Sequence, residues 1–307
     1  MQRPIRKVLI WAAPAILAAS AACAADSHPD LQGIWTAGTL TPFERPPQAG
    51  PQLSEAERAE QQRVATEKFW AAGHKPGEVG RDNDAFIDQD LKILPNGQTS
   101  LVVEPADGRV PVRPEALRRR DFNLSNFDSY ETMSQWDRCI TRQPTAMFPG
   151  VYNNSYQIVQ TRDHVLIVAE MIHDARIVPL SRDAVTAPHA DQRVRSWAGD
   201  SRGHWEGSTL VVETTNFNGS GWIATSQNSS MRGVPYSEQL RTVERFTRID
   251  HDTMQYEITI DDPVNYTAPW KVAYPLTRDD QYQVFEYACH EGNQAVESIL
   301  RGARAQE

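Results

Sequence analysis

Hydrophobic and polar residues alternate over most of the chain beyond residue 150, which is the pattern of half-buried β-strands. These stretches are rich in Val, Ile, Thr, Tyr and Phe and are separated by Asp, Asn, Gly and Pro. The pattern predicts strands over residues 154–160, 164–170, 171–178, 209–215, 240–249, 253–260, 268–275 and 282–289, with the clearest hairpin turn at 249–253. Many strands without alternating helices favour an antiparallel sheet. We therefore expect a mainly β fold, an antiparallel barrel or sandwich of lipocalin-like type, and prefer the barrel because closure removes exposed strand edges.

The first half of the chain has weaker periodicity. A helix is predicted over residues 53–72, because Ser54 is a good N-cap residue and Glu57 follows three positions later, completing a capping box. A short strand is expected at 99–104 and partly helical structure at 115–136. We expect residues 25–150 to be long wrapping segments with this one N-terminal helix, forming one structural unit with a barrel-like domain at 151–307.

The first 24 residues have the pattern of a secretory signal peptide. Basic residues precede the apolar run 8–22, and small residues at 22–24 offer a cleavage site. The run is too short for a comfortable membrane span, which needs about 20 residues, so no membrane span is predicted. Lipidation of Cys23 is a less favoured alternative, because Ser20 stands where a large aliphatic residue is usual. The sequence predicts a periplasmic or secreted protein.

Charge and cysteine content narrow the partners and the compartment. The net charge of −9 disfavours a nucleic-acid partner, which needs a basic face. Cys139 and Cys289 remain once the signal is removed, and an even count in an exported chain predicts one disulfide. Two unpaired buried thiols are the alternative.

The densest group of ionisable residues lies at 170–176, between apolar stretches. It contains Glu170, His173 and Arg176. Burying a charge is costly unless it is paired, so such a cluster indicates either a hairpin tip in water or a polar pocket. The sequence leaves both interpretations open.

Two further segments carry candidate groups. Glu213 follows three apolar residues near the end of a predicted strand, where it is either a buried carboxylate or a solvated outward group. Trp197 begins the Gly-rich segment 197–207, for which a structured loop with packed Trp side chains, leading into the strand at 209–215, is favoured over a role in a site. His290 and Tyr287 lie beside the predicted disulfide, and His290 is either a well-placed acid or base or an ordinary polar residue.

Several common chemistries lack their sequence motifs. The chain has no nucleophile elbow, phosphate loop, dinucleotide fingerprint or His-Glu-x-x-His helix. A metal site built from His173, His290 and a carboxylate is a weaker alternative. Zinc sites often contain two ligands that are close together in the sequence, and these residues include no such pair. We therefore expect no metal and no cofactor. The oligomeric state is left open.

The strings YNNSYQIVQT, GDSRGHWEGSTLVVETTNFNG, VERFTRID, TMQYEITIDDP and EYACHEGN resemble a widespread family of secreted bacterial β-rich proteins that often occur as several paralogues in one genome. The resemblance covers about residues 30–305. It implies an association with the breakdown of plant-derived aromatic compounds by cofactor-independent lyases or decarboxylases. It transfers no catalytic residue.

The sequence thus predicts a cofactor-independent lyase, for example a decarboxylase, acting on a small aromatic or hydrophobic acid. His173 or His290 would move the proton, and Glu170 or Glu213 would orient or share it. Arg176 would hold the substrate carboxylate, with Tyr287 and Trp197 as apolar walls. The alternative is a periplasmic lipocalin-like protein that binds a small molecule without catalysis.

Overall fold

The computed structural model describes residues 28–71, 91–142, 145–150, 152–182, 186–223 and 233–305. The predicted signal peptide and Cys23 lie outside these residues. In the part of the chain that the structure describes, no helix is long and apolar enough to cross a bilayer.

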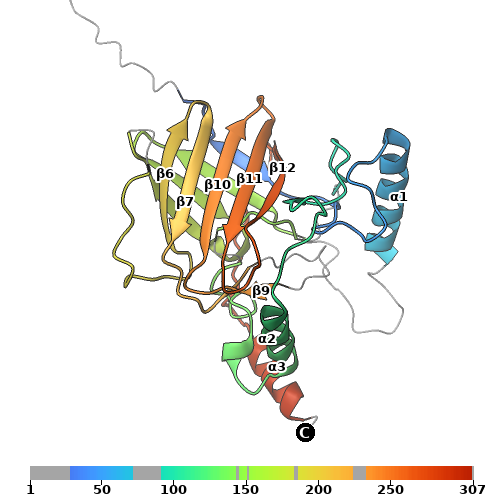
Figure 1. The fold of residues 1–307 in the computed structure, drawn as a ribbon, viewed down its shortest axis with the longest axis vertical. Helices are drawn as coiled ribbons and strands as arrows, with labels where there is room; N and C mark the ends of the chain where they lie inside the picture. Colours follow the sequence, from blue (N-terminus) through green and yellow to red (C-terminus); the bar gives the residue numbers. More distant parts are fainter. Residues whose placement is uncertain are drawn as a thin grey trace, which may run out of the picture.

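The architecture is a single antiparallel sheet that curls into a nearly closed barrel (Figure 1). Nine strands follow one another in the order β5–β4–β3–β1–β12–β11–β10–β7–β6, and β2 pairs with β12 beside them. The strands are β1 Gly33–Thr36, β2 Val102–Glu104, β3 Ser155–Gln160, β4 His164–Ala169, β5 Ala175–Pro179, β6 Asp200–Glu206, β7 Thr209–Thr215, β10 Arg241–Arg248, β11 Thr253–Asp261 and β12 Trp270–Arg278. Two short strands, β8 Trp222–Ile223 and β9 Val234–Pro235, form a separate pair. A barrel is therefore the correct choice between the two predicted architectures.

The two ends of the sheet, β5 and β6, meet through one bridge between Leu180 and Gly203. The Ser181 N–H donates to the Gly203 carbonyl across 2.8 Å. A Cβ atom at Gly203 would lie 2.7 Å from a Leu180 methyl carbon, so glycine is the residue that lets the two ends approach.

Helices lie outside the barrel. They are α1 Glu55–Ala71, α2 Pro114–Ser125 and α3 Ala295–Arg304, with short 3-10 turns η1 Tyr130–Thr132 and η2 Met171–His173. The predicted capping box begins α1: Glu57 accepts hydrogen bonds from the backbone N–H and hydroxyl of Ser54 at 2.8 and 2.7 Å. The C-terminal helix α3 was not predicted, and none of its residues is buried.

The N-terminal part of the chain supplies strands to the same sheet. β1 lies between β3 and β12, and β2 pairs with the start of β12. Residues before 150 therefore complete the barrel wall as well as wrapping it.

Large side chains fill the barrel. Trp35, Phe246, Tyr256 and Tyr274 are all fully buried. They belong to one core cluster, in which Tyr256 packs edge-on against Tyr274 with ring centroids 5.9 Å apart. The strand alternation that predicted the sheet also sends these rings inward, and the interior of the barrel around them is a packed core.

Three strand predictions need correction. The predicted strand at 282–289 is wrong: this segment joins no ladder among the described residues, and its Phe285 side chain is 63% exposed. The predicted strand at 171–178 begins only at Ala175, because residues 171–173 form a tight turn. Residues 200–206 were interpreted as a loop because of their glycines, yet they form β6.

Candidate functional site

The ionisable cluster at 170–176 lies on a tight turn at one end of the barrel, between β4 and β5. Ile172 and His173 have φ angles of 68° and 54°, the left-handed region that side chains rarely adopt. This turn separates the cluster into buried and exposed members: Glu170 is fully buried, whereas His173 is exposed. The hairpin-tip interpretation is therefore correct for His173, and the interpretation as a buried polar group is correct for Glu170.

Glu170 fastens the C-terminal segment across the barrel end. One carboxylate oxygen, Oε1, accepts hydrogen bonds from the Tyr282 hydroxyl at 2.6 Å and from the Phe285 N–H at 3.1 Å. Its other oxygen, Oε2, is buried without a hydrogen-bond partner among the described residues. We call residues 282–293 the C-terminal cap.

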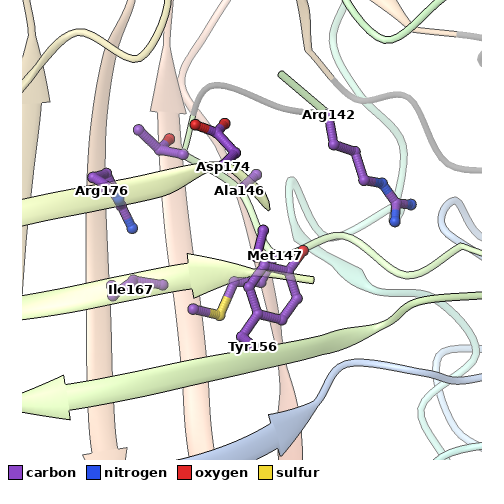
Figure 2. A pocket seen from close by; sticks show the side chains of 9 residues that line it. Arg142, Ala146, Met147, Tyr156, Ile167, Asp174 and Arg176 are labelled. Carbon is purple, nitrogen blue, oxygen red and sulfur yellow. The ribbon is translucent and has the colours of Figure 1, made fainter. Parts of the chain in front are cut away.

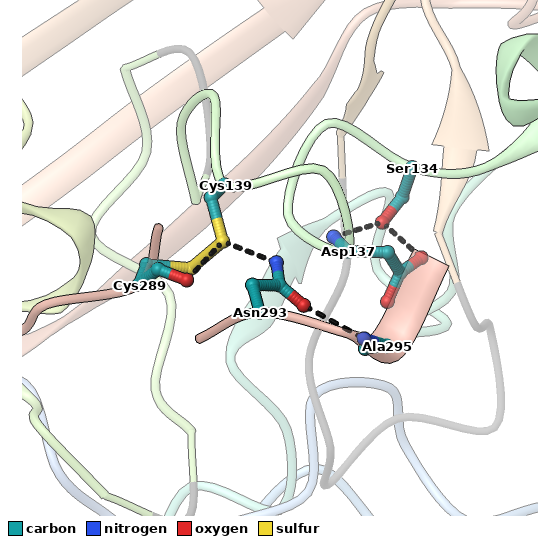
Figure 3. Close-up of a disulfide and its surroundings, with 6 residues drawn as sticks. All are labelled: Ser134, Asp137, Cys139, Cys289, Asn293 and Ala295. Carbon is teal, nitrogen blue, oxygen red and sulfur yellow. Dashed lines mark hydrogen bonds between the residues drawn. A yellow bond between two sulfur atoms is a disulfide. The ribbon is translucent and has the colours of Figure 1, made fainter. Parts of the chain in front are cut away.

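His173 holds the same cap. Its Nε2 accepts a hydrogen bond from the Tyr287 N–H at 2.9 Å. Tyr287 stacks on Tyr152 with ring centroids 6.5 Å apart, and burial, followed by the contact with Tyr152, raises the pKa of Tyr287 to about 12. The predicted disulfide is present: it joins Cys139 to Cys289 and so links the C-terminal cap covalently to the segment around residue 139 (Figure 3).

Arg176 points into the barrel, where it is paired with Glu244 of β10. The guanidinium makes two hydrogen bonds to the carboxylate, and the one between Nη2 and Oε1 measures 3.0 Å. The Tyr256 hydroxyl donates to the same carboxylate across 3.0 Å. Burial acts to lower the pKa of Arg176, but the attraction of Glu244 outweighs it and raises that pKa. The group predicted to hold the substrate carboxylate is therefore occupied by a carboxylate of the chain itself.

A small pocket of about 30 Å³ opens beside this ion pair. Figure 2 places Asp174 and Arg176 on one side, Met147 and Tyr156 in the middle and Arg142 on the other side. A volume of this size holds one or two water molecules or a single carboxylate group. It does not hold an aromatic ring.

Arg142 is the unusual member of the pocket. It is only 3% exposed, yet among the described residues none of its three guanidinium nitrogens has a hydrogen-bond partner. The guanidinium lies over the ring of Trp136, 5.3 Å from its centroid, and against the backbone of Gly150. A buried charge without a counter-ion is costly. The guanidinium of Arg142 is therefore able to bind an anion that enters the pocket.

Asp174 supplies the other ionisable group of the pocket. Burial raises the pKa of this carboxyl, against the opposing effects of a hydrogen bond from the Thr141 hydroxyl and of nearby Arg176. Burial also raises the pKa of Tyr156, on β3. Asp174 can therefore keep its proton at a higher pH than an ordinary aspartate and can donate it inside the pocket.

The remaining predicted residues do not line this pocket. Glu213 lies on the outer face of β7, where it accepts a 2.9 Å hydrogen bond from Arg241 that lowers its pKa. Trp197 packs against Arg138, whose guanidinium carbon is 5.4 Å from the ring centroid. His290 is exposed in the C-terminal cap.

Arg142 and Glu244 were not among the residues predicted from the sequence, and Asp174 belonged to the ionisable cluster at 170–176 but was given no role there. Glu244 had a signal, because the alternation of β10 places it on the same face as Thr242 and Phe246. Arg142 had none, since it lies in an irregular segment that precedes the first barrel hairpin.

No protein-family model, no curated protein and no solved structure matches the chain. Within the described ranges, no group of three or more His, Cys, Asp or Glu side chains is placed to hold a metal ion.

Proposed function

We propose that this chain binds a small organic acid at the barrel end, with the acid's carboxylate held by Arg142. The single observation that supports this is the buried guanidinium with no hydrogen-bond partner among the described residues. Guanidinium matches the planar, two-oxygen geometry of a carboxylate, and the pocket volume suits that group.

The surroundings of Arg142 favour an acid with an aromatic or apolar body. Trp136 lies against the guanidinium, and the stacked pair of Tyr152 and Tyr287 is part of the same cluster. Because the pocket is too small for a ring, the body of the ligand would lie at its mouth, against these aromatic side chains.

We propose further that the site is that of a cofactor-independent lyase, and a decarboxylase is the example we favour. The specific observation is Asp174, a carboxyl with a raised pKa in the same pocket as Arg142. The bond between the carboxylate carbon and its neighbour would break and release CO₂, leaving the electron pair on the neighbouring carbon. Asp174 would give its proton to that carbon and recover one from water, so that acid plus proton yields product plus CO₂.

We propose that the protein is periplasmic or secreted. The disulfide supports this location, since such bonds persist in oxidising compartments. The proposed activity also agrees with the family that the sequence motifs resemble. Glu170 and His173 would act as positioning residues that hold the C-terminal cap.

The test is a titration of the oxidised protein with benzoate, cinnamate and 4-hydroxycinnamate by calorimetry, followed by mass spectrometry of each mixture. The uncharged amides of the same acids are the ligand controls. We expect the acids to bind and the amides to bind at least tenfold more weakly, because the charged hydrogen bonds are lost. Loss of CO₂ from a bound acid supports the lyase, and binding without a product supports the carrier.

Two variants make the test specific. Arg142→Met should abolish acid binding, whereas Arg138→Met removes the same charge at the same barrel end, from an arginine that stacks between Tyr130 and Trp197. Asp174→Asn should bind the acid and release no CO₂. Equal binding of acids and amides, or equal losses in the two arginine variants, would contradict the proposal.

A further inference from the structure

A second pocket lies at the opposite end of the barrel. It has a volume of about 190 Å³ and opens between the turn that joins β3 to β4 and the chain that leaves β5. Its floor is formed by Trp205 of β6 and by His28, whose rings stack with centroids 4.6 Å apart and planes 4° from parallel. This is the end at which β5 and β6 close the barrel through a single bridge.

Part of the pocket wall is already occupied by internal hydrogen bonds. The Gln160 side chain accepts from the Leu31 N–H at 2.9 Å and donates to the Pro29 carbonyl at 3.2 Å, which fixes the segment that carries His28. The Thr161 hydroxyl donates to the His164 carbonyl at 3.0 Å. These bonds use the hydroxyl proton of Thr161 and one of the two amide protons of Gln160, so both side chains hold the pocket wall in place.

Other groups at the pocket are available. The Ser181 hydroxyl and the His28 Nδ1 are buried atoms that have no hydrogen-bond partner among the described residues. Arg162 and Arg182 bring two positive charges to the rim. Arg182 forms an ion pair with Asp163, with 3.5 Å between the nitrogen and the oxygen. Both side chains are more than half exposed, so water screens this pair and it is weak.

We propose that this pocket binds a small oxyanion of the size of inorganic phosphate. Arg162 and Arg182 would each donate charged hydrogen bonds to its oxygens, and the Ser181 hydroxyl would donate a further one from below. The pocket is smaller than the 300 Å³ or more that drug-sized ligands occupy, which favours a compact anion over a nucleotide. The site is separate from the organic-acid site and does not depend on the function proposed for it.

The test is calorimetric titration of the full oxidised chain with inorganic phosphate at constant ionic strength, with sulfate, acetate and chloride as further arms. We expect saturable binding of phosphate and a weaker response to acetate. Arg162→Ala with Arg182→Ala should weaken phosphate binding at least tenfold, because two charged hydrogen bonds are lost. Ser181→Ala should weaken it several-fold without lowering thermal stability, since its hydroxyl has no partner to lose among the described residues.

The matched control removes two other exposed arginines, Arg118 and Arg193, each of which forms an ion pair with a carboxylate close to it in sequence. This double variant has the same net charge as the double variant at the pocket. It should bind phosphate like the parent protein. Equal weakening in both double variants, or no saturable binding of phosphate by the parent protein, would overturn the proposal.

Discussion

Two buried arginines lie at the same end of this barrel and differ in one respect. Arg176 has a carboxylate partner, Glu244, which is itself fully buried and receives a further hydrogen bond from Tyr256. Arg142 is 3% exposed and has no hydrogen-bond partner among the described residues. Both side chains line one small pocket.

The difference separates a charge whose partner lies within the fold from one for which we propose a partner outside it. A buried charge that has a counter-ion within the protein does not indicate a binding site, because the fold itself supplies the partner. An unpaired one costs free energy in the folded state, and that cost is offset only when an anion enters. This is why we assign the substrate carboxylate to Arg142, although the sequence had suggested Arg176.

The largest effect should come from breaking the internal pair. Arg176→Met leaves Glu244 buried without its counter-ion, and we expect the free energy of unfolding to fall by about 3–5 kcal/mol. Urea unfolding followed by circular dichroism measures this loss. Arg176→Met combined with Glu244→Leu should recover most of the loss, because no unpaired charge then remains. A single variant as stable as the parent protein would show that the pair contributes nothing.

A smaller effect of opposite sign is expected at the unpaired arginine. Arg142→Met removes a buried charge that has no described counter-ion, which should raise the free energy of unfolding by about 1 kcal/mol in ligand-free buffer. The lost contact with Trp136 opposes this gain only in part. The same urea experiment measures it. A loss of 3 kcal/mol or more would mean that Arg142 has a structural partner after all.

The smallest effect concerns the pH dependence of Asp174. Burial raises its pKa in the folded state, so the folded protein binds this proton more tightly than the unfolded chain does. The resulting stabilisation is complete below the unfolded pKa of about 3.9 and is lost as pH rises through the folded pKa. Asp174→Asn, which stays neutral, should therefore gain stability over the parent protein as pH increases. Unfolding curves at several pH values between 4 and 8 measure the difference, and parallel curves would contradict it.

The strand pattern of the sequence predicted much of the barrel, because inward and outward side chains alternate along each strand. Seven strands (β2, β3, β4, β7, β10, β11 and β12) lie within three residues of their predicted bounds. The hairpin at 249–253 is confirmed. Local alternation sufficed there because each of these strands has one face in the core.

The candidate site was much harder to predict, because its contacts join segments far apart in the chain. The cap at 282–293 has alternating apolar residues like a strand, yet its backbone is held by the side chains of Glu170 and His173, more than 100 residues away. The pairing of Arg176 with Glu244 also depends on the closure of the whole barrel. No local pattern distinguishes a paired arginine from an unpaired one.

The most direct test of the account observes the two guanidinium groups themselves. Nitrogen-15 labelling of arginine gives an Nε–Hε signal for each side chain, and the signals of Arg142 and Arg176 can be assigned from the two methionine variants. We predict that titration with cinnamate shifts the Arg142 signal in a saturable way and leaves the Arg176 signal nearly unchanged. An Arg142 signal that stays in place while cinnamate binds would contradict the central claim.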